Sequence, residues 1–257
     1  VFELVDNQLR NTAGYEANAS FSLGYVSDRV KSETLMSNVN GKNGFFANAH
    51  GLEVGGTWPI HSILTDTTRV AAADTRMPDP THVTIALSGW QLKGDPATAR
   101  DIEMVLRRTG RAGTRLRCSL LGSVNRQHTP RRLRTRLERL PGASSGPLPV
   151  ADYAQRLADS GVVWPPKRDQ YATQSSGKAV DALVAGRPVL LPSGSAGHAE
   201  QERWVPGAPS YRSSEELLDL LEDLPELVEP WADRLRERKE EIAAHYSANR
   251  TIEILTG

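Results

Sequence analysis

The second half of the chain alternates between two hydrophobic patterns. Short apolar runs that end in glycine, such as THVTIALSG at 81–89 and LRCSLLG at 116–122, are typical of buried strands. Between them, ATARDIEMVLRRTG at 97–110 places apolar residues every three or four positions, which predicts an amphipathic helix that ends in glycine. Strands that alternate with helices of about ten to fifteen residues predict a parallel sheet with right-handed crossovers.

The alternation continues toward the C-terminus. Two further strands are expected, VVWPP and RPVLLP, and GASSGPLP at 142–149 is expected to be a surface loop. Helices are expected over RRLRTRLERLPG, with Leu133, Leu137 and Leu140 on one face, and over VADYAQRLADSG, SGKAVDALVAG, SEELLDLLEDL and the polar WADRLRERKEEIAAHYS. We therefore predict a Rossmann-like α/β domain, with a parallel sheet flanked by helices, over 81–225, and C-terminal helices over 226–257. Residues 1–80 give a mixed signal and are interpreted as a partial or reduced N-terminal domain.

Composition narrows the classes of function. The chain has 31 basic and 31 acidic residues, so its net charge offers no global attraction to nucleic acid or to an anionic membrane. A single cysteine, Cys118, excludes an internal disulfide framework and a cysteine-rich zinc site. No apolar run approaches the roughly 18 residues of a membrane span, and the N-terminus lacks the order of a signal peptide. We expect a cytoplasmic protein with no metal or cofactor.

Parallel sheets of this kind bind ligands at the carboxyl ends of their strands. That rule points to the loops after Leu87, Leu121, Trp164 and Leu191.

The loop and helix after Trp164 carry the strongest motif, SSGKAVDALVAGRPVLLP. If Ser175 or Ser176 caps the helix and Gly177 begins it, the free N–H groups of the first turn face the ligand edge, with no Cβ at Gly177 to obstruct an anion such as a diphosphate. Lys178 adds a positive charge, and Asp181 can accept hydrogen bonds from ribose hydroxyls. The structural alternative is an ordinary N-cap with a surface pair between Lys178 and Asp181 at i,i+3.

A second motif, LSGWQLKGDP, follows the first strand. Gly89 lets the backbone approach a ligand, and Lys93 can reach a phosphate from the opposite side of a cleft. By itself this combination is common in surface loops.

In this order the segments SGWQLKG, LRCSLLG, PLPVADYAQRLADSGVVWPP and SSGKAVDALVAGRPVLLP resemble the C-terminal, nucleotide-sugar-binding half of GT-B glycosyltransferases, particularly the retaining family 4 type. The resemblance covers about residues 60 to 240. It implies that the co-substrate is a nucleotide-diphosphate sugar and that Asp181 holds the ribose. The residues it places at the donor diphosphate are Gly89, Lys93, Ser175, Ser176, Gly177 and Lys178.

Two departures from the family pattern limit what the resemblance implies. The family has an acidic residue that contacts the transferred sugar eight positions before its ribose-binding one, and Thr173 stands there in this chain. The roughly 80 residues before Thr81 are also few for a complete acceptor domain. The chain is then truncated, reduced, or completed by another subunit in a homo- or hetero-oligomer. No catalytic residue of that side can be assigned, and His50 and His61 are more typical of structural or solvated histidines.

The resulting prediction is a retaining, metal-independent glycosyltransferase that acts on an unidentified acceptor. The alternatives are a non-catalytic partner subunit with a donor-like domain and a sugar-nucleotide epimerase on the same scaffold. A weaker alternative is an enzyme that acts on nucleic acid, because RQHTPRRLRTRLER at Arg126–Arg139 holds six arginines that suit the phosphates of nucleic acid or anionic lipid. The simpler interpretation of that segment is an amphipathic helix with a solvated basic face.

Overall fold

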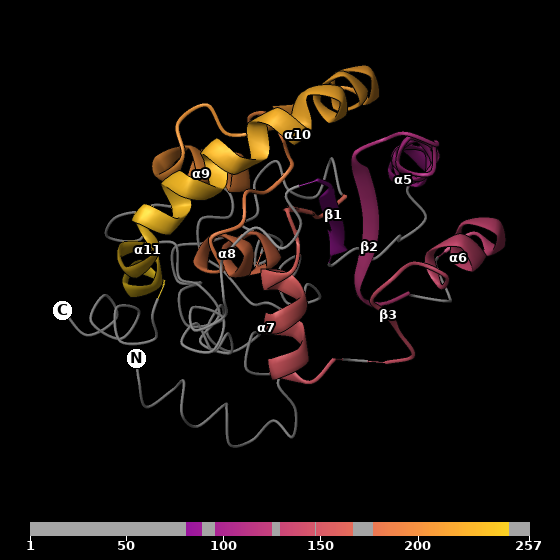
Figure 1. Cartoon of the computed structure of the whole chain (residues 1–257), viewed down its shortest axis with the longest axis horizontal. Helices are drawn as coiled ribbons and strands as arrows, with labels where there is room; N and C mark the ends of the chain where they lie inside the picture. The colour runs from indigo at the N-terminus through magenta and orange to yellow at the C-terminus, as the bar shows by residue number, and fades with distance from the viewer. Residues whose placement is uncertain (1–80, 89–95, 125–128, 147, 167–176, 247–257) are drawn as a thin grey trace, which may run out of the picture.

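A computed structural model describes residues 81–88, 96–124, 129–146, 148–166 and 177–246 of the chain (Figure 1). The predicted N-terminal region 1–80 lies outside these residues, so its interpretation as a partial domain stays a prediction.

The four-stranded sheet is parallel throughout and has the order β3-β2-β1-β4. Its strands are β1 (Val83–Ser88), β2 (Leu116–Ser123), β3 (Ala143–Ser144) and β4 (Val162–Trp164). β1 lies between β2 and β4, with Leu87 opposite Leu120 on one side and Trp164 on the other. The buried strands 83–88 and 162–164 confirm the apolar runs as central strands. β3 was not predicted, since its two residues fall within the expected loop 142–149.

A second pair of parallel strands extends this sheet. β5 (Leu191–Pro192) pairs with β6 (Ser210–Tyr211), and a parallel bridge between Val163 and Val189 joins the approach to β5 to β4. The combined order is then 3-2-1-4-5-6, which is the order of a dinucleotide-binding Rossmann sheet. The expected strand 187–192 is shorter than predicted, because only its last two residues enter a ladder.

The helices that connect the strands are α5 (Pro96–Thr109), α6 (Arg131–Leu137), α7 (Val150–Ala158), α8 (Gly177–Val184), α9 (Ala196–Trp204), α10 (Ser214–Glu237) and α11 (Lys239–His245). Four of the first five helices, α5 to α8, coincide with segments predicted to be helical, whereas α9 was not predicted. Two helices were expected over 214–224 and 231–247, but the break between the two observed helices comes later in the chain. α10 continues through Pro225 and Pro230 and ends at Glu237, and α11 follows. α10 therefore runs through the proposed domain boundary at 225, which itself stays a prediction.

Local sequence signals set several helix ends. Ser213 caps α10 by accepting a hydrogen bond from the Glu216 N–H at 3.2 Å, and the Glu216 carboxylate accepts one from the Arg212 N–H at 2.7 Å. Gly186, two residues after the end of α8, has a φ of 68°, which is readily adopted only by glycine. The Arg187 N–H then bonds back to the Ala182 carbonyl at 2.8 Å, which turns the chain sharply toward β5.

The helices divide into two groups around the sheet. α5 and α6 lie beside β2, and α9 and α11 lie toward the opposite end of the molecule, with α7 and α8 between them (Figure 1). α10 crosses from the neighbourhood of α5 to α11, and ion pairs from Glu222 to Arg108 and from Glu226 to Arg115 fasten it to the α5–β2 end. One continuous core connects the described strands and helices.

Candidate nucleotide-sugar site

The strand order places a crevice between β1 and β4. The order 3-2-1-4-5-6 reverses direction there, since β2 and β3 lie on one side of β1 while β5 and β6 continue the sheet beyond β4. In open parallel sheets the ligand binds at such a switch point, outside the carboxyl ends of the strands. The two segments singled out in the sequence, 89–95 and 167–178, follow β1 and β4 directly. The strands that precede these segments, β1 and β4, are the two neighbours at the switch point.

α7 and α8 bring three polar side chains together. The Tyr153 hydroxyl of α7 donates a 2.8 Å hydrogen bond to Oδ2 of Asp181 on α8. Lys178 Nζ lies 3.8 Å from the same oxygen and 4.0 Å from the centre of the Tyr153 ring. The cation therefore touches both the carboxylate and the electron-rich face of the ring.

The members of this cluster differ in how far they are buried. The Asp181 side chain is 6% exposed, whereas Lys178 is 33% exposed and is the member that faces water. Burial raises the pKa of Tyr153 well above its ordinary value, and the charge of Asp181 and the hydrogen bond to it raise the pKa further. Tyr153 thus stays a neutral phenol that donates to Asp181.

The Lys178–Asp181 contact matches the structural alternative as well as the functional one. An i,i+3 ion pair on a helix needs no ligand to explain it. What the alternative does not explain is Tyr153, which lies 28 residues earlier in the chain and adds a third polar group to the pair. No periodicity in the sequence links Tyr153 with Asp181, although Tyr153 lies in a segment that carries the family resemblance.

Ser88, the last residue of β1, is a further polar group at the crevice. Its side chain is fully buried, and its hydroxyl has no hydrogen-bond partner among the described residues. It directly precedes Gly89, so it lies at the carboxyl end of the strand, where the loop predicted to bind the donor begins.

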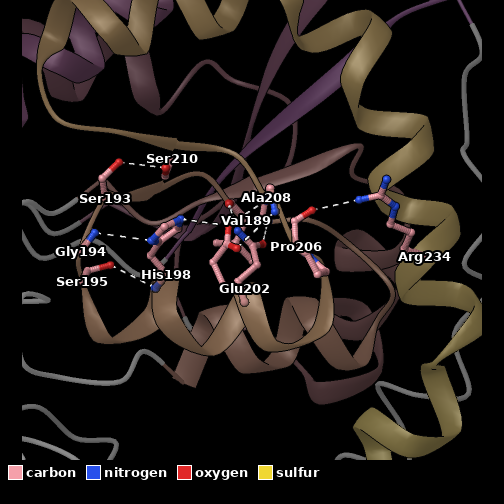
Figure 2. Close-up of polar contacts among 12 residues, drawn as sticks. Val189, Ser193, Gly194, Ser195, His198, Glu202, Pro206, Ala208, Ser210 and Arg234 are labelled. Atoms are coloured by element: carbon pink, nitrogen blue, oxygen red, sulfur yellow. Dashed lines mark hydrogen bonds and ion pairs between the residues drawn. The ribbon is translucent and has the colours of Figure 1, made fainter.

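In the loop after β5 the polar groups bind one another (Figure 2). Ser193 donates to Ser210 at 2.8 Å, and Ser195 caps α9 by accepting from the His198 N–H at 3.1 Å. His198 Nδ1 accepts from the Gly194 N–H at 3.4 Å, while Nε2 faces Glu202 at 3.4 Å. The His198 ring is therefore held as part of the loop, and this loop is the weaker candidate for a ligand site.

The predicted site residues divide into those the structure describes and those it does not. Lys178 and Asp181 lie together at the start of α8, and Gly177 is its first residue. Several other predicted positions, namely Gly89, Lys93, Thr173, Ser175 and Ser176, lie outside the described residues, as do His50, His61 and Arg126. Their roles stay predictions.

The described residues contain neither a candidate metal site nor a candidate membrane span. No group of three or more histidine, cysteine, aspartate or glutamate side chains in them is arranged to hold a metal ion. In the same residues no helix combines the length and the apolar character needed to cross a bilayer.

No family model and no curated protein matches the sequence. Among solved structures, the chain is similar to HepE of Anabaena in complex with UDP and glucose, at a TM-score of 0.54 and 15% identity, with 94% of this chain and 74% of HepE covered. HepE in complex with UDP-glucose gives a TM-score of 0.53 at 15% identity and covers 90% and 70%. The chain has a GT-B glycosyltransferase-like fold, as the sequence resemblance predicted.

Another similar structure is CalG4, the calicheamicin glycosyltransferase, at a TM-score of 0.43 and 16% identity. That alignment covers 70% of this chain, but the chain spans only 43% of the length of CalG4.

Proposed function

We propose that the chain binds a nucleotide-diphosphate sugar at the β1–β4 crevice and transfers the sugar to an acceptor. The observation that carries this proposal is the topology, since both segments with predicted diphosphate-binding residues leave adjacent strands at the switch point of the sheet. The cluster of Tyr153, Lys178 and Asp181 at the same place has the chemistry that a nucleoside diphosphate requires, a cation and a hydrogen-bonding carboxylate.

Each group has a defined task in the proposed reaction. The N–H groups of the first turn of α8 and the ammonium of Lys178 stabilise the negative charge that grows on the leaving nucleoside diphosphate. Asp181 accepts hydrogen bonds from ribose hydroxyls, and Tyr153 holds its carboxylate in place. Lys93 in the loop after β1 approaches the diphosphate from the other side of the crevice.

Charge neutralisation by amides and lysines lets the reaction proceed without a metal ion. We further propose that the sugar keeps its configuration. The acceptor hydroxyl then attacks on the face that the diphosphate leaves, the bond from the anomeric carbon to the diphosphate oxygen breaks, and that oxygen takes the acceptor's proton. No protein nucleophile is needed in this scheme.

Calorimetric titration of the purified chain with UDP, GDP and ADP tests the proposal. Binding of one nucleotide in the micromolar range is expected, with a loss of at least about tenfold in Lys178→Ala and in Asp181→Asn, since hydrogen bonds and ion pairs to charged groups contribute about 1.5–3 kcal/mol. Arg212→Ala, which removes an exposed cation at the start of α10, is the matched control and should bind as the unmodified chain does.

Product analysis then separates the three functions. Transfer of the sugar, or slow release of free sugar and nucleoside diphosphate into water, supports a transferase. An altered sugar that is still attached to the nucleotide would identify an epimerase. Nucleotide binding without turnover of any donor would favour the non-catalytic partner subunit, and absence of nucleotide binding would overturn the proposal.

A further inference from the structure

The outer face of α6 is a concentrated basic surface that the proposed site does not use. Arg131, Arg132, Arg136 and Arg139 are exposed, whereas Leu133 and Leu137 of the same segment are fully buried. None of these four arginines forms an ion pair with another described residue, in contrast to Arg108 and Arg115, which pair with Glu222 and Glu226 of α10. We call these four exposed arginines the α6 arginine face.

The arrangement of the α6 arginine face has an energetic cost in the isolated protein. Arg132 and Arg136 are four positions apart, so their like charges lie on neighbouring turns and destabilise the helix by about 0.2–0.5 kcal/mol. Arg131 and Arg132 also occupy the first turn, where the helix dipole disfavours positive charge and where α6 has no acidic residue. A bound anionic partner would offset both effects.

Charge is unevenly distributed over the whole molecule. Residues 100–139 contain 12 arginines, no lysine and three acidic residues, whereas α10 contains nine acidic residues and two arginines. α6 lies at the β2 end of the molecule, and α10 runs away from that end toward α11 (Figure 1). Among the described residues a basic segment and an acidic helix are thus distinct, and they meet where Arg108 and Arg115 pair with Glu222 and Glu226.

We propose that the α6 arginine face docks the protein onto an anionic phospholipid bilayer. Guanidinium groups bind phosphate through paired N–H donors, so a row of arginines fits a surface of phosphate headgroups. The buried leucines leave no apolar group on α6 to insert, so the attachment is electrostatic and peripheral. A flat anionic surface can touch α6 while the acidic α10 extends away from it, because charges are screened within about 10 Å at moderate salt.

Nucleic acid fits this face less well. The seven residues of α6 span about 10 Å, which is short compared with binding tracks of about 4–16 nucleotides. Neither α5 nor α6 contains an aromatic residue on which a base can stack. A long polyanion that continued past α6 toward α10 would meet the acidic residues of that helix.

The docking orientation has a consequence for the acceptor, and this step alone rests on the proposed function. α6 follows the carboxyl end of β2, and the β1–β4 crevice opens at the same edge of the sheet. A bilayer on the α6 arginine face therefore lies near that edge, which suits an acceptor anchored in the lipid surface.

Vesicle sedimentation tests the docking without any nucleotide, so its result is independent of the proposed catalytic activity. The full chain should sediment with vesicles of phosphatidylcholine and phosphatidylglycerol, not with pure phosphatidylcholine, and should be released by high salt. Each basic residue near an anionic surface contributes about 1 kcal/mol, so Arg132→Gln/Arg136→Gln is expected to partition about thirtyfold more weakly. The charge-preserving Arg132→Lys/Arg136→Lys should retain most of the binding.

The matched control is Arg212→Gln/Arg234→Gln, which removes two exposed charges outside α6 and should sediment like the unmodified chain. Equal sedimentation of the α6 variant and this control would overturn the proposal, as would equal binding to neutral vesicles. Salt-sensitive binding of an oligonucleotide that is lost in the α6 variant, with no vesicle binding, would assign the face to nucleic acid instead. Circular dichroism confirms that all variants are folded.

Discussion

Asp181 shows how one residue can serve both the structure and the proposed reaction. Its carboxylate is almost fully buried and accepts a hydrogen bond from Tyr153, while Lys178 supplies a nearby positive charge. A buried carboxylate is tolerated only when charge or hydrogen bonds compensate for its lost hydration. The same compensation fixes the orientation in which Asp181 would meet a ribose.

Tyr153→Phe is expected to weaken UDP binding by between about twofold and tenfold, because it removes one hydrogen bond that positions Asp181. The effect should be smaller than that of Asp181→Asn, since the ligand itself loses no contact. Calorimetric titration measures both variants.

Tyr246→Phe is the matched control for this prediction. The Tyr246 hydroxyl also donates to a carboxylate, that of Glu200, but it lies between α9 and the end of α11. Tyr246→Phe should leave the affinity for UDP unchanged. An equal effect of the two variants would mean that Tyr153 acts through general stability and has no positioning role.

At the scale of elements, a side chain of α9 supplies hydrogen bonds to the backbone of Val189, just before β5, where no strand among the described residues does so. The Gln201 side chain accepts a 2.6 Å hydrogen bond from the Val189 N–H and donates a 2.8 Å bond to the Val189 carbonyl. One amide side chain thus pairs with both backbone groups of a buried residue, as a neighbouring strand would. This pairing supports the turn that leads from α8 into β5.

Gln201→Met is expected to lower the free energy of unfolding by about 2–4 kcal/mol, because two buried backbone groups lose their partners while the side-chain volume is nearly kept. Urea denaturation followed by circular dichroism measures the change. Gln155→Met, at an exposed position of α7, should stay within about 0.5 kcal/mol of the unmodified chain. A similar value for both variants would show that the Val189 groups find other partners.

At the scale of the whole molecule, three groups among the described residues that ionise at alkaline pH are held neutral. Burial raises the pKa of the Cys118 thiol from 9.0 to about 12. Burial, reinforced by Asp181 and by Glu200 respectively, raises the pKa values of Tyr153 and Tyr246 well above their ordinary 10.0. The folded state therefore holds these protons more tightly than the unfolded chain does.

This difference predicts a loss of stability at high pH. The contribution of each group is fully present below its unfolded pKa, about 9 for the thiol and 10 for the phenols, and decreases as pH rises toward the folded value. Each group adds up to about 1.4 kcal/mol per pH unit to the slope in that window.

Urea denaturation across an alkaline pH series measures this slope. Tyr153→Phe/Tyr246→Phe is expected to be less stable at neutral pH but to have a shallower slope above about pH 10, since two titrating groups are gone. Parallel curves for this variant and the unmodified chain would contradict the assignment of the slope to these tyrosines.

Much of the fold was predictable because its signals are local. Apolar runs, helical periodicity and glycine at strand and helix ends located the central strands and most helices, and Gly186 marked the end of α8. Single-sequence patterns failed where a segment is short or polar, as in β3 and α9, or where tertiary contacts override a helix breaker, as at Pro225 and Pro230 in α10.

The sequence by itself determined the parallel α/β class, the helix that begins at Gly177 and the presence of Lys178 and Asp181 on it, because periodicity and spacing act within one segment. Only the tertiary structure decided that β1 and β4 are neighbours, that Tyr153 meets Asp181, and that the arginines of α6 face outward over buried leucines. Strand order and contacts across 28 residues depend on how separate segments pack, and no local pattern encodes that packing.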